Sequence, residues 1–226
     1  PRVDGKELYD IFFQMRLDHP EIFWVVGVSW KYYPDSPNLI FVPEYLFEKG
    51  KIKEHQIALT SRVEKLARQA QGLSEWEKEK YVHDFICENV RYDKLKKPYS
   101  HEIIGPLGQG VGVCEGIAKA VKVLCDALGL WCMIAICGDL WEYPSEFARG
   151  EDVLFWPVFI NYPIAEWKNG VENEYAQQAA CVCKEVLLVD SLGDEKNVFG
   201  GCCRFSDGCT VQSLETGEEG MLTVEI

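Results

Sequence analysis

Hydrophobic residues recur every three to four positions in four stretches of the chain, which predicts four amphipathic helices. The expected helices cover residues 4–17, 51–71, 74–89 and 114–128. The pairs Asp4/Glu7 and Ser74/Glu77 have the spacing of a capping box, in which side chains and backbone N–H groups satisfy each other at a helix start. Gly129 follows the fourth helix as a stop signal.

Other stretches are rich in β-branched and aromatic residues and predict strands. The first, residues 21–30, is expected to be a buried strand, and the turn-forming segment Tyr33–Pro37 joins it to residues 38–42 as a hairpin. The remaining predicted strands cover residues 131–137, 153–160, 179–190, 210–211 and 222–226. Because the helices come first and the strands follow, the pattern predicts an α+β fold.

The length of 226 residues suits one large domain or one domain with an appendage. We expect a single domain over residues 1–226. Within it, an N-terminal helix and strand region (1–72) precedes a core with the fourth helix (73–138) and a strand-rich C-terminal region (139–226). Hydrophobic residues make up 47% and charged residues 26%, which indicates a globular protein rather than a disordered one.

The charge balance narrows the partners. Asp and Glu outnumber Lys and Arg by 36 to 23, a net charge of -13, so the surface would repel nucleic-acid backbones and anionic lipids. The longest apolar runs, residues 131–137 and 153–160, are shorter than the roughly 18 residues of a membrane span. We therefore expect a soluble protein. The chain begins at Pro1 without an apolar leader, so a signal segment has been removed or the chain is an excised piece, and the compartment is unassigned.

Ten cysteines form two groups. Four lie in apolar periodic stretches and are expected to be reduced and structural: Cys87, Cys125, Cys132 and Cys137. Five lie close together in the last third and could be disulfides, a metal site or free thiols: Cys181, Cys183, Cys202, Cys203 and Cys209. Zinc is disfavoured because no Cys-x-x-Cys pair or nearby His supplies the usual ligand spacing, and no metal or other cofactor is predicted.

Cys114 is the residue with the clearest chemical potential. It follows a glycine-rich segment and begins the fourth predicted helix, where the helix dipole and unpaired backbone N–H groups stabilise a thiolate. Gly112 and Gly116 on either side would permit a tight entry and the close approach of a substrate backbone. The alternative from spacing alone is a buried cysteine that only packs.

The residues around Cys114 resemble the core motif of the transglutaminase-like superfamily, the papain-related group of cysteine peptidases and acyltransferases. The resemblance rests on Tyr99-Ser-His-Glu and on Gly112-Val-Cys-Glu-Gly with its continuation to Gly129. Segments similar to bacterial members of the group are residues 18–24 and 73–93, and the whole resemblance covers about residues 3–138.

The resemblance implies a papain-like fold in which the Cys-bearing helix packs on an antiparallel sheet. It also implies attack on an amide of a peptide or protein substrate through a thioester, and it is compatible with an extracytoplasmic location. In the family, a His on a strand after the nucleophile is its base, and an Asp on the next strand orients that His. Cys114 matches the nucleophile, and Asp190, which follows Val189 and precedes Asp194 by four residues, matches the orienting Asp. Asp190 could instead be a turn residue at a strand end.

The family's histidine has no counterpart after Cys114. All four histidines precede it: His19, His55, His83 and His101. An ungapped count back from Asp190 falls on Tyr175, whose phenol cannot deprotonate a thiol as imidazole does. Three explanations are open: His101 serves as the base, the fold is kept for a non-catalytic binding or scaffolding role, or the C-terminal third is not the family's own sequence.

Overall fold

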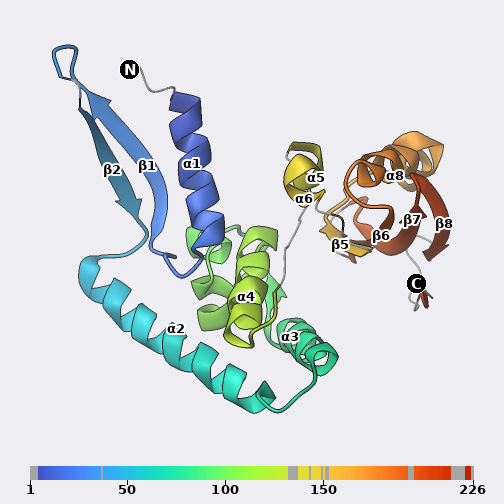
Figure 1. The fold of residues 1–226 in the computed structure, drawn as a ribbon, viewed down its shortest axis with the longest axis horizontal. Helices are drawn as coiled ribbons and strands as arrows, with labels where there is room; N and C mark the ends of the chain where they lie inside the picture. Colours follow the sequence, from blue (N-terminus) through green and yellow to red (C-terminus); the bar gives the residue numbers. More distant parts are fainter. Residues whose placement is uncertain are drawn as a thin grey trace. The chain divides into compact units, whose positions relative to one another are not determined.

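The computed structural model describes residues 5–36, 38–131, 137–142, 144–148, 150, 153–192, 196–214 and 222–224. The chain forms two compact units, Pro1–Cys132 and Met133–Ile226, and each is described by itself (Figure 1). The expectation of a single domain over residues 1–226 stays a prediction. The capping residue Asp4 and most of the strand predicted over residues 131–137 lie outside the described residues.

All four predicted helices are present in the first unit. They are α1 (Gly5–Asp18), α2 (Lys49–Ala70), α3 (Glu75–Asn89) and α4 (Cys114–Ala127). The capping box of α3 is confirmed, because the Glu77 N–H donates to Ser74 Oγ and the Ser74 N–H donates to Glu77 Oε2. Gly129 has a φ of 70° and ends α4, as its position predicted.

The predicted hairpin consists of β1 (Val25–Tyr32) and β2 (Leu39–Tyr45), which pair antiparallel. Helix α1 lies beside it, with 6.1 Å between the ring centroids of Phe12 and Phe41 (Figure 1). The expectation of a buried strand over residues 21–30 is wrong, because a sheet of two strands has little around it to cover its faces. Tyr32 and Phe41 remain 74% and 51% exposed.

The core of the first unit surrounds α4. Helices α2 and α3 both pack against it, and the buried side chains include Leu59 of α2, Val82 of α3 and Leu124 of α4. The segment between α3 and α4 contains β3 (Arg91–Tyr92), η1 (Pro98–His101), η2 (Gly105–Gln109) and β4 (Val111–Gly112). This segment carries the side chains that lie next to Cys114.

The second unit is a four-stranded sheet with helices. Its strands are β5 (Val153–Val158), β6 (Glu185–Leu192), β7 (Phe199–Ser206) and β8 (Cys209–Leu214), in that order across the sheet. The pairs β6/β7 and β7/β8 are antiparallel, but β5 and β6 are parallel. A parallel pair needs a crossover, and this one contains α7 (Ile164–Glu166), η3 (Trp167–Val171) and α8 (Glu172–Ala180).

Several expectations for the last third are corrected. The strand predicted over residues 179–190 begins only at Glu185, because Ala179 belongs to α8. The strand β7 was not predicted, and Leu222–Val224 form no strand. The short helices α5 (Asp139–Glu142) and α6 (Pro144–Phe147), together with α8, also show that helices continue among the strands. The fold class, α+β, is nevertheless as expected.

Tyr175 lies on α8 and not on a strand, so the ungapped count from Asp190 does not identify a position on the sheet. Its ring packs among three tryptophans, with centroid distances of 4.6 Å to Trp141 and 5.3 Å to both Trp156 and Trp167. Burial, and then the neighbouring Tyr162, raise the pKa of Tyr175 to about 12. The phenol is therefore a protonated core group.

Among the described residues, no helix has the length and apolar character needed to cross a membrane.

Candidate active site

Cys114 is the first residue of α4, as the sequence predicted. Val113 precedes it in an extended conformation, and the Val113 N–H donates to the Ser100 carbonyl oxygen at 3.0 Å. The cysteine is half-buried. Its sulfur therefore belongs to the first turn of a 14-residue helix, where the helix dipole favours a thiolate.

Two glycines allow the chain to fold tightly around Cys114. A Cβ on Gly116 would overlap the Ser100 carbonyl oxygen and lie 3.2 Å from the carbonyl carbon of His101. A Cβ on Gly112 would lie 2.7 Å from Cγ of Pro106. The expectation that these glycines leave room for a substrate backbone is therefore wrong, because the chain's own segment fills that space.

His101 ends the short helix η1, which packs against α4. Its Nδ1 lies 3.1 Å from Oε2 of Glu115, the residue that follows Cys114. The imidazole is 40% exposed, so a substrate has access to the ring. The structure therefore places His101 on the turn beside the start of the cysteine helix.

Glu115 belongs to a buried network of charges. Lys119 donates to Glu115 Oε1 at 2.7 Å, to Glu102 Oε2 at 3.0 Å and to the His101 carbonyl oxygen at 3.1 Å. Arg16 of α1 pairs with Glu102 and lies 3.5 Å from Glu115 Oε1. The side chains of Lys119 and Glu102 are each only 2% exposed. Two cations and two carboxylates thus balance in a place from which water is largely excluded.

The two carboxylates of this network respond differently. Burial raises the pKa of Glu102, although Lys119 and Arg16 oppose the shift. Burial also acts to raise the pKa of Glu115, but Lys119, Arg16 and the hydrogen bond from His101 outweigh it, so its pKa is lowered. Glu115 is therefore a carboxylate at neutral pH and can orient an imidazole.

Asp93 fixes the segment that carries His101. Its carboxylate accepts hydrogen bonds from the Ser100 hydroxyl, the Leu95 N–H at 3.1 Å and the Lys97 N–H at 3.0 Å. The hydrogen bond from Ser100, followed by that from Lys97, lowers the pKa of Asp93. Four residues of one loop thus depend on one ionised side chain.

We expect the first unit to lose stability in acid through Asp93. Because the pKa is lower in the folded state, the stabilisation is present above the usual carboxyl pKa and is lost as the pH falls through the folded value, between about pH 5 and pH 2. Asp93→Asn should flatten this part of the pH profile of urea unfolding, whereas Asp35→Asn in the exposed hairpin turn should leave it unchanged. An unaltered profile in Asp93→Asn would refute this role.

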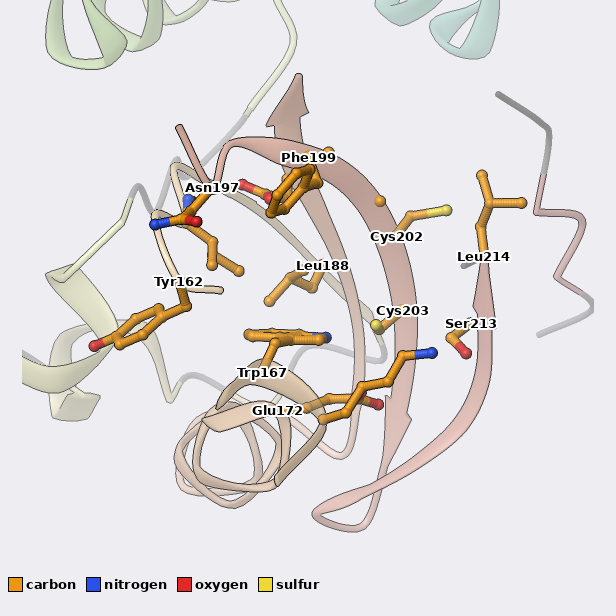
Figure 2. Close-up of a pocket in the computed structure, with 15 residues that line it drawn as sticks. Tyr162, Trp167, Glu172, Leu188, Asn197, Phe199, Cys202, Cys203, Ser213 and Leu214 are labelled. Atoms are coloured by element: carbon orange, nitrogen blue, oxygen red, sulfur yellow. Dashed lines mark hydrogen bonds between the residues drawn. The ribbon is translucent and has the colours of Figure 1, made fainter. Parts of the chain in front are cut away.

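Asp190, the predicted orienting residue, belongs to the second unit. It pairs with Val158 across β5/β6, and its Oδ1 accepts the Ile160 N–H at 2.8 Å. Asp190 also lines a cavity of about 250 Å³, which Figure 2 shows with Trp167 and Cys203 among the lining side chains. Cys114 and His101 are therefore neighbours in the first unit, while Asp190 lies in a separate one.

The other cysteines are less suited to nucleophilic chemistry or differ from expectation. Burial, and then Glu172, raise the pKa of Cys203 to about 12, so that thiol stays protonated. Cys125 is buried as expected, but Cys87 is exposed, with its Sγ 3.5 Å from Nε2 of His83. Among the late cysteines, none of Cys181, Cys202, Cys203 and Cys209 forms a disulfide in the structure. Within the described ranges, no cluster of three or more His, Cys, Asp or Glu side chains could hold a metal ion.

Sequence reasoning missed Glu115 and its network. The available signals were local, since Glu115 follows Cys114 directly and stands four residues before Lys119, the spacing of a helical ion pair. The contribution of Arg16 had no such signal, because it lies 86 residues before Glu102.

The fold and the position of Cys114 are those of a papain-like thiol protein, and the comparison with known families agrees. Residues 61–160 match the family model of the transglutaminase-like superfamily. This part of the chain, from within α2 to the end of β5, belongs to that superfamily, which confirms the resemblance. The match extends beyond residue 138, where the resemblance was expected to end. No curated protein matches the chain.

The matched segment includes a strand after α4 but no histidine on it. The strand β5 is Val-Leu-Phe-Trp-Pro-Val, and its neighbour β6 carries Asp190. Apolar residues therefore occupy the strand of this segment on which the family would place its base.

Proposed function

We propose that the chain acts on an amide bond of a peptide or protein substrate through a thioester at Cys114, as a cysteine peptidase or acyltransferase. The observation that carries the proposal is the placement of Cys114 at the first residue of α4 beside the turn of His101, whose Nδ1 lies 3.1 Å from Glu115. A nucleophile, an imidazole and an ionised carboxylate are the three parts of a thiol-dependent triad.

In the proposed reaction, Glu115 accepts the hydrogen bond of the His101 Nδ1–H, which leaves Nε2 as the basic atom. The Cys114 thiol gives its proton to Nε2, and its sulfur forms a bond to the carbonyl carbon. As the C–N bond breaks, His101 returns the proton to the leaving amine. Water or a second amine then attacks the thioester and regenerates the thiol. Backbone N–H groups at the start of α4 are donors for the oxyanion.

Two carboxylates are candidates for orienting His101. Glu115 is favoured by its hydrogen-bond distance and its lowered pKa. Asp190 is favoured by its resemblance to the family pattern, and it remains the alternative because its carboxylate already accepts the Ile160 N–H. The two assignments predict different mutants to be impaired.

A second candidate function is a non-catalytic binding or scaffolding protein on the same fold. The observation that favours it is β5, whose six residues include no histidine although the strand lies within the family match. Without an imidazole near it, a cysteine thiol of ordinary pKa is only a few per cent ionised at pH 7.

The rate at which Cys114 is alkylated by iodoacetamide, measured against pH and localised by peptide mapping, tests the proposal. We expect an apparent thiol pKa well below 8.5 and a loss of about tenfold in rate at pH 7 in His101→Ala, since most of the thiolate would be lost. Glu115→Gln should weaken reactivity if Glu115 orients the ring, and Asp190→Asn should do so if Asp190 does.

Cys114→Ala controls for the identity of the labelled peptide, and the exposed Cys209 in the same sample is an internal reference for reagent and pH. A Cys114 that reacts with an ordinary pKa, or only after unfolding, would contradict the proposal and favour the binding function.

A further inference from the structure

A second site lies on the first unit, in a cleft between α2 and η2 of about 330 Å³. We call it the α2–η2 cleft. Its apolar lining includes Leu59, Ile104 and Leu107, which also belong to the buried core. The volume falls within the range of ligand sites in proteins, and the apolar lining could accept one or two side chains.

The charged residues of the α2–η2 cleft are all basic. His55, Arg62 and Lys65 line it, and its lining contains no Asp or Glu, although the chain carries 13 more acidic than basic residues. The spacing of these residues along α2 places them on one side of the helix. The cleft is therefore a positive surface on an acidic protein.

Two of these cations are not neutralised within the protein. Most of the described lysines and arginines near an acid form ion pairs, such as Lys51 with Glu54 and Arg68 with Glu64 on the same helix. Within the described residues, neither Arg62 nor Lys65 has a carboxylate partner. The Arg62 guanidinium lies 5.8 Å from the centre of the Phe85 ring, which holds it while its N–H groups stay available.

We infer that the α2–η2 cleft binds an acidic peptide segment, with carboxylate side chains on Arg62 and Lys65 and an apolar neighbour on the lining of Leu59 and Leu107. A planar guanidinium matches a carboxylate, and an apolar wall beside two cations matches alternating acidic and apolar side chains. The binding does not depend on the proposed function; only the further step, that the bound segment belongs to the substrate, rests on it.

The place of the cleft in the chain supports that step. Its wall η2 ends at Gln109, five residues before Cys114, and η2 packs against α4. A peptide held there would be anchored on the same unit that carries the thiol.

The test uses the full chain with Cys114→Ala, so that failure of the thiol chemistry cannot affect the result. Binding of a fluorescein-labelled peptide of alternating glutamate and leucine is followed by anisotropy, against the same peptide with glutamine for glutamate and against inorganic phosphate as competitor. We expect the acidic peptide to bind at least about tenfold more tightly than the glutamine peptide, and more weakly as salt rises.

Arg62→Gln with Lys65→Gln should weaken binding of the acidic peptide by about tenfold. The matched control is Lys49→Gln with Lys53→Gln, which removes the same charge from the same helix outside the cleft. Exchange of the Gly108 amide, on the cleft wall, should slow when the peptide binds.

Equal loss in the control pair would overturn the inference, because it would show a general charge effect. Equal binding of the glutamine peptide, or a site that phosphate occupies while the peptide does not bind, would overturn it as well.

Discussion

Replacing Lys119 by methionine is expected to destabilise the first unit by about 3–5 kcal/mol, the cost of leaving a buried charge without its partner. The ammonium donates to two carboxylates and one carbonyl, and it is 2% exposed. Methionine fills similar space but leaves Glu102 and Glu115 with Arg16 alone. The deficit should shrink as the pH falls, because burial has already raised the pKa of Glu102 and protonation removes the unpaired charge.

Urea unfolding with hydrogen exchange of α4 peptides measures this loss for the first unit alone. Lys122→Met is the matched control, since Lys122 lies on the same helix and pairs with Asp126 at the surface, where such pairs contribute under about 1 kcal/mol. Adding Glu102→Gln to Lys119→Met restores the charge balance and should recover more than 1 kcal/mol. A Lys119→Met protein as stable as the Lys122→Met control would contradict the network.

The second large effect is expected for Gly116→Ala. The new Cβ would overlap the Ser100 carbonyl oxygen, and that oxygen is also the acceptor for the Val113 N–H. The turn can move away only by giving up this hydrogen bond, so the loss should reach about 3 kcal/mol or more. Because the same turn carries His101, the reactivity of Cys114 should fall even in molecules that remain folded.

Gly50→Ala is the control for this substitution. Gly50 also lies in a helix, but nothing lies within 4 Å of an added Cβ, so stability should stay level or rise slightly. The comparison is made by urea midpoint and by the alkylation rate of Cys114 under native conditions. Unchanged values for both in Gly116→Ala would mean that η1 does not pack closely on α4.

The elements that could be predicted from the sequence are those fixed by local chemistry. Helix α3 begins at its capping box and α4 ends before Gly129, since both signals act within a few residues. The placement of Cys114 at the start of α4 follows from the same local pattern. The motif of the transglutaminase-like superfamily is also contiguous, which is why it could be read without a structure.

The parts that could not be predicted depend on contacts between distant residues. Strand β7 contains Gly200 and Gly201, both with positive φ, so its sequence resembles a turn until β6 and β8 pair with it. Helix α8 is largely polar and shows little periodicity. The role of Glu115 needed the turn of His101 to be folded against α4, and the link from Arg16 to Glu102 spans 86 residues.

The packing of Tyr175 among three tryptophans gives the second unit its own optical signature. Rigid indole and phenol rings at 4.6 to 5.3 Å couple their electronic transitions, so they should dominate the near-ultraviolet circular dichroism of residues 133–226. Trp76 and Trp131 of the first unit are more than 70% exposed and should add little to that band. Melting of the sheet around Trp156 can therefore be followed as a spectral change while α4 and its cysteine are monitored by alkylation.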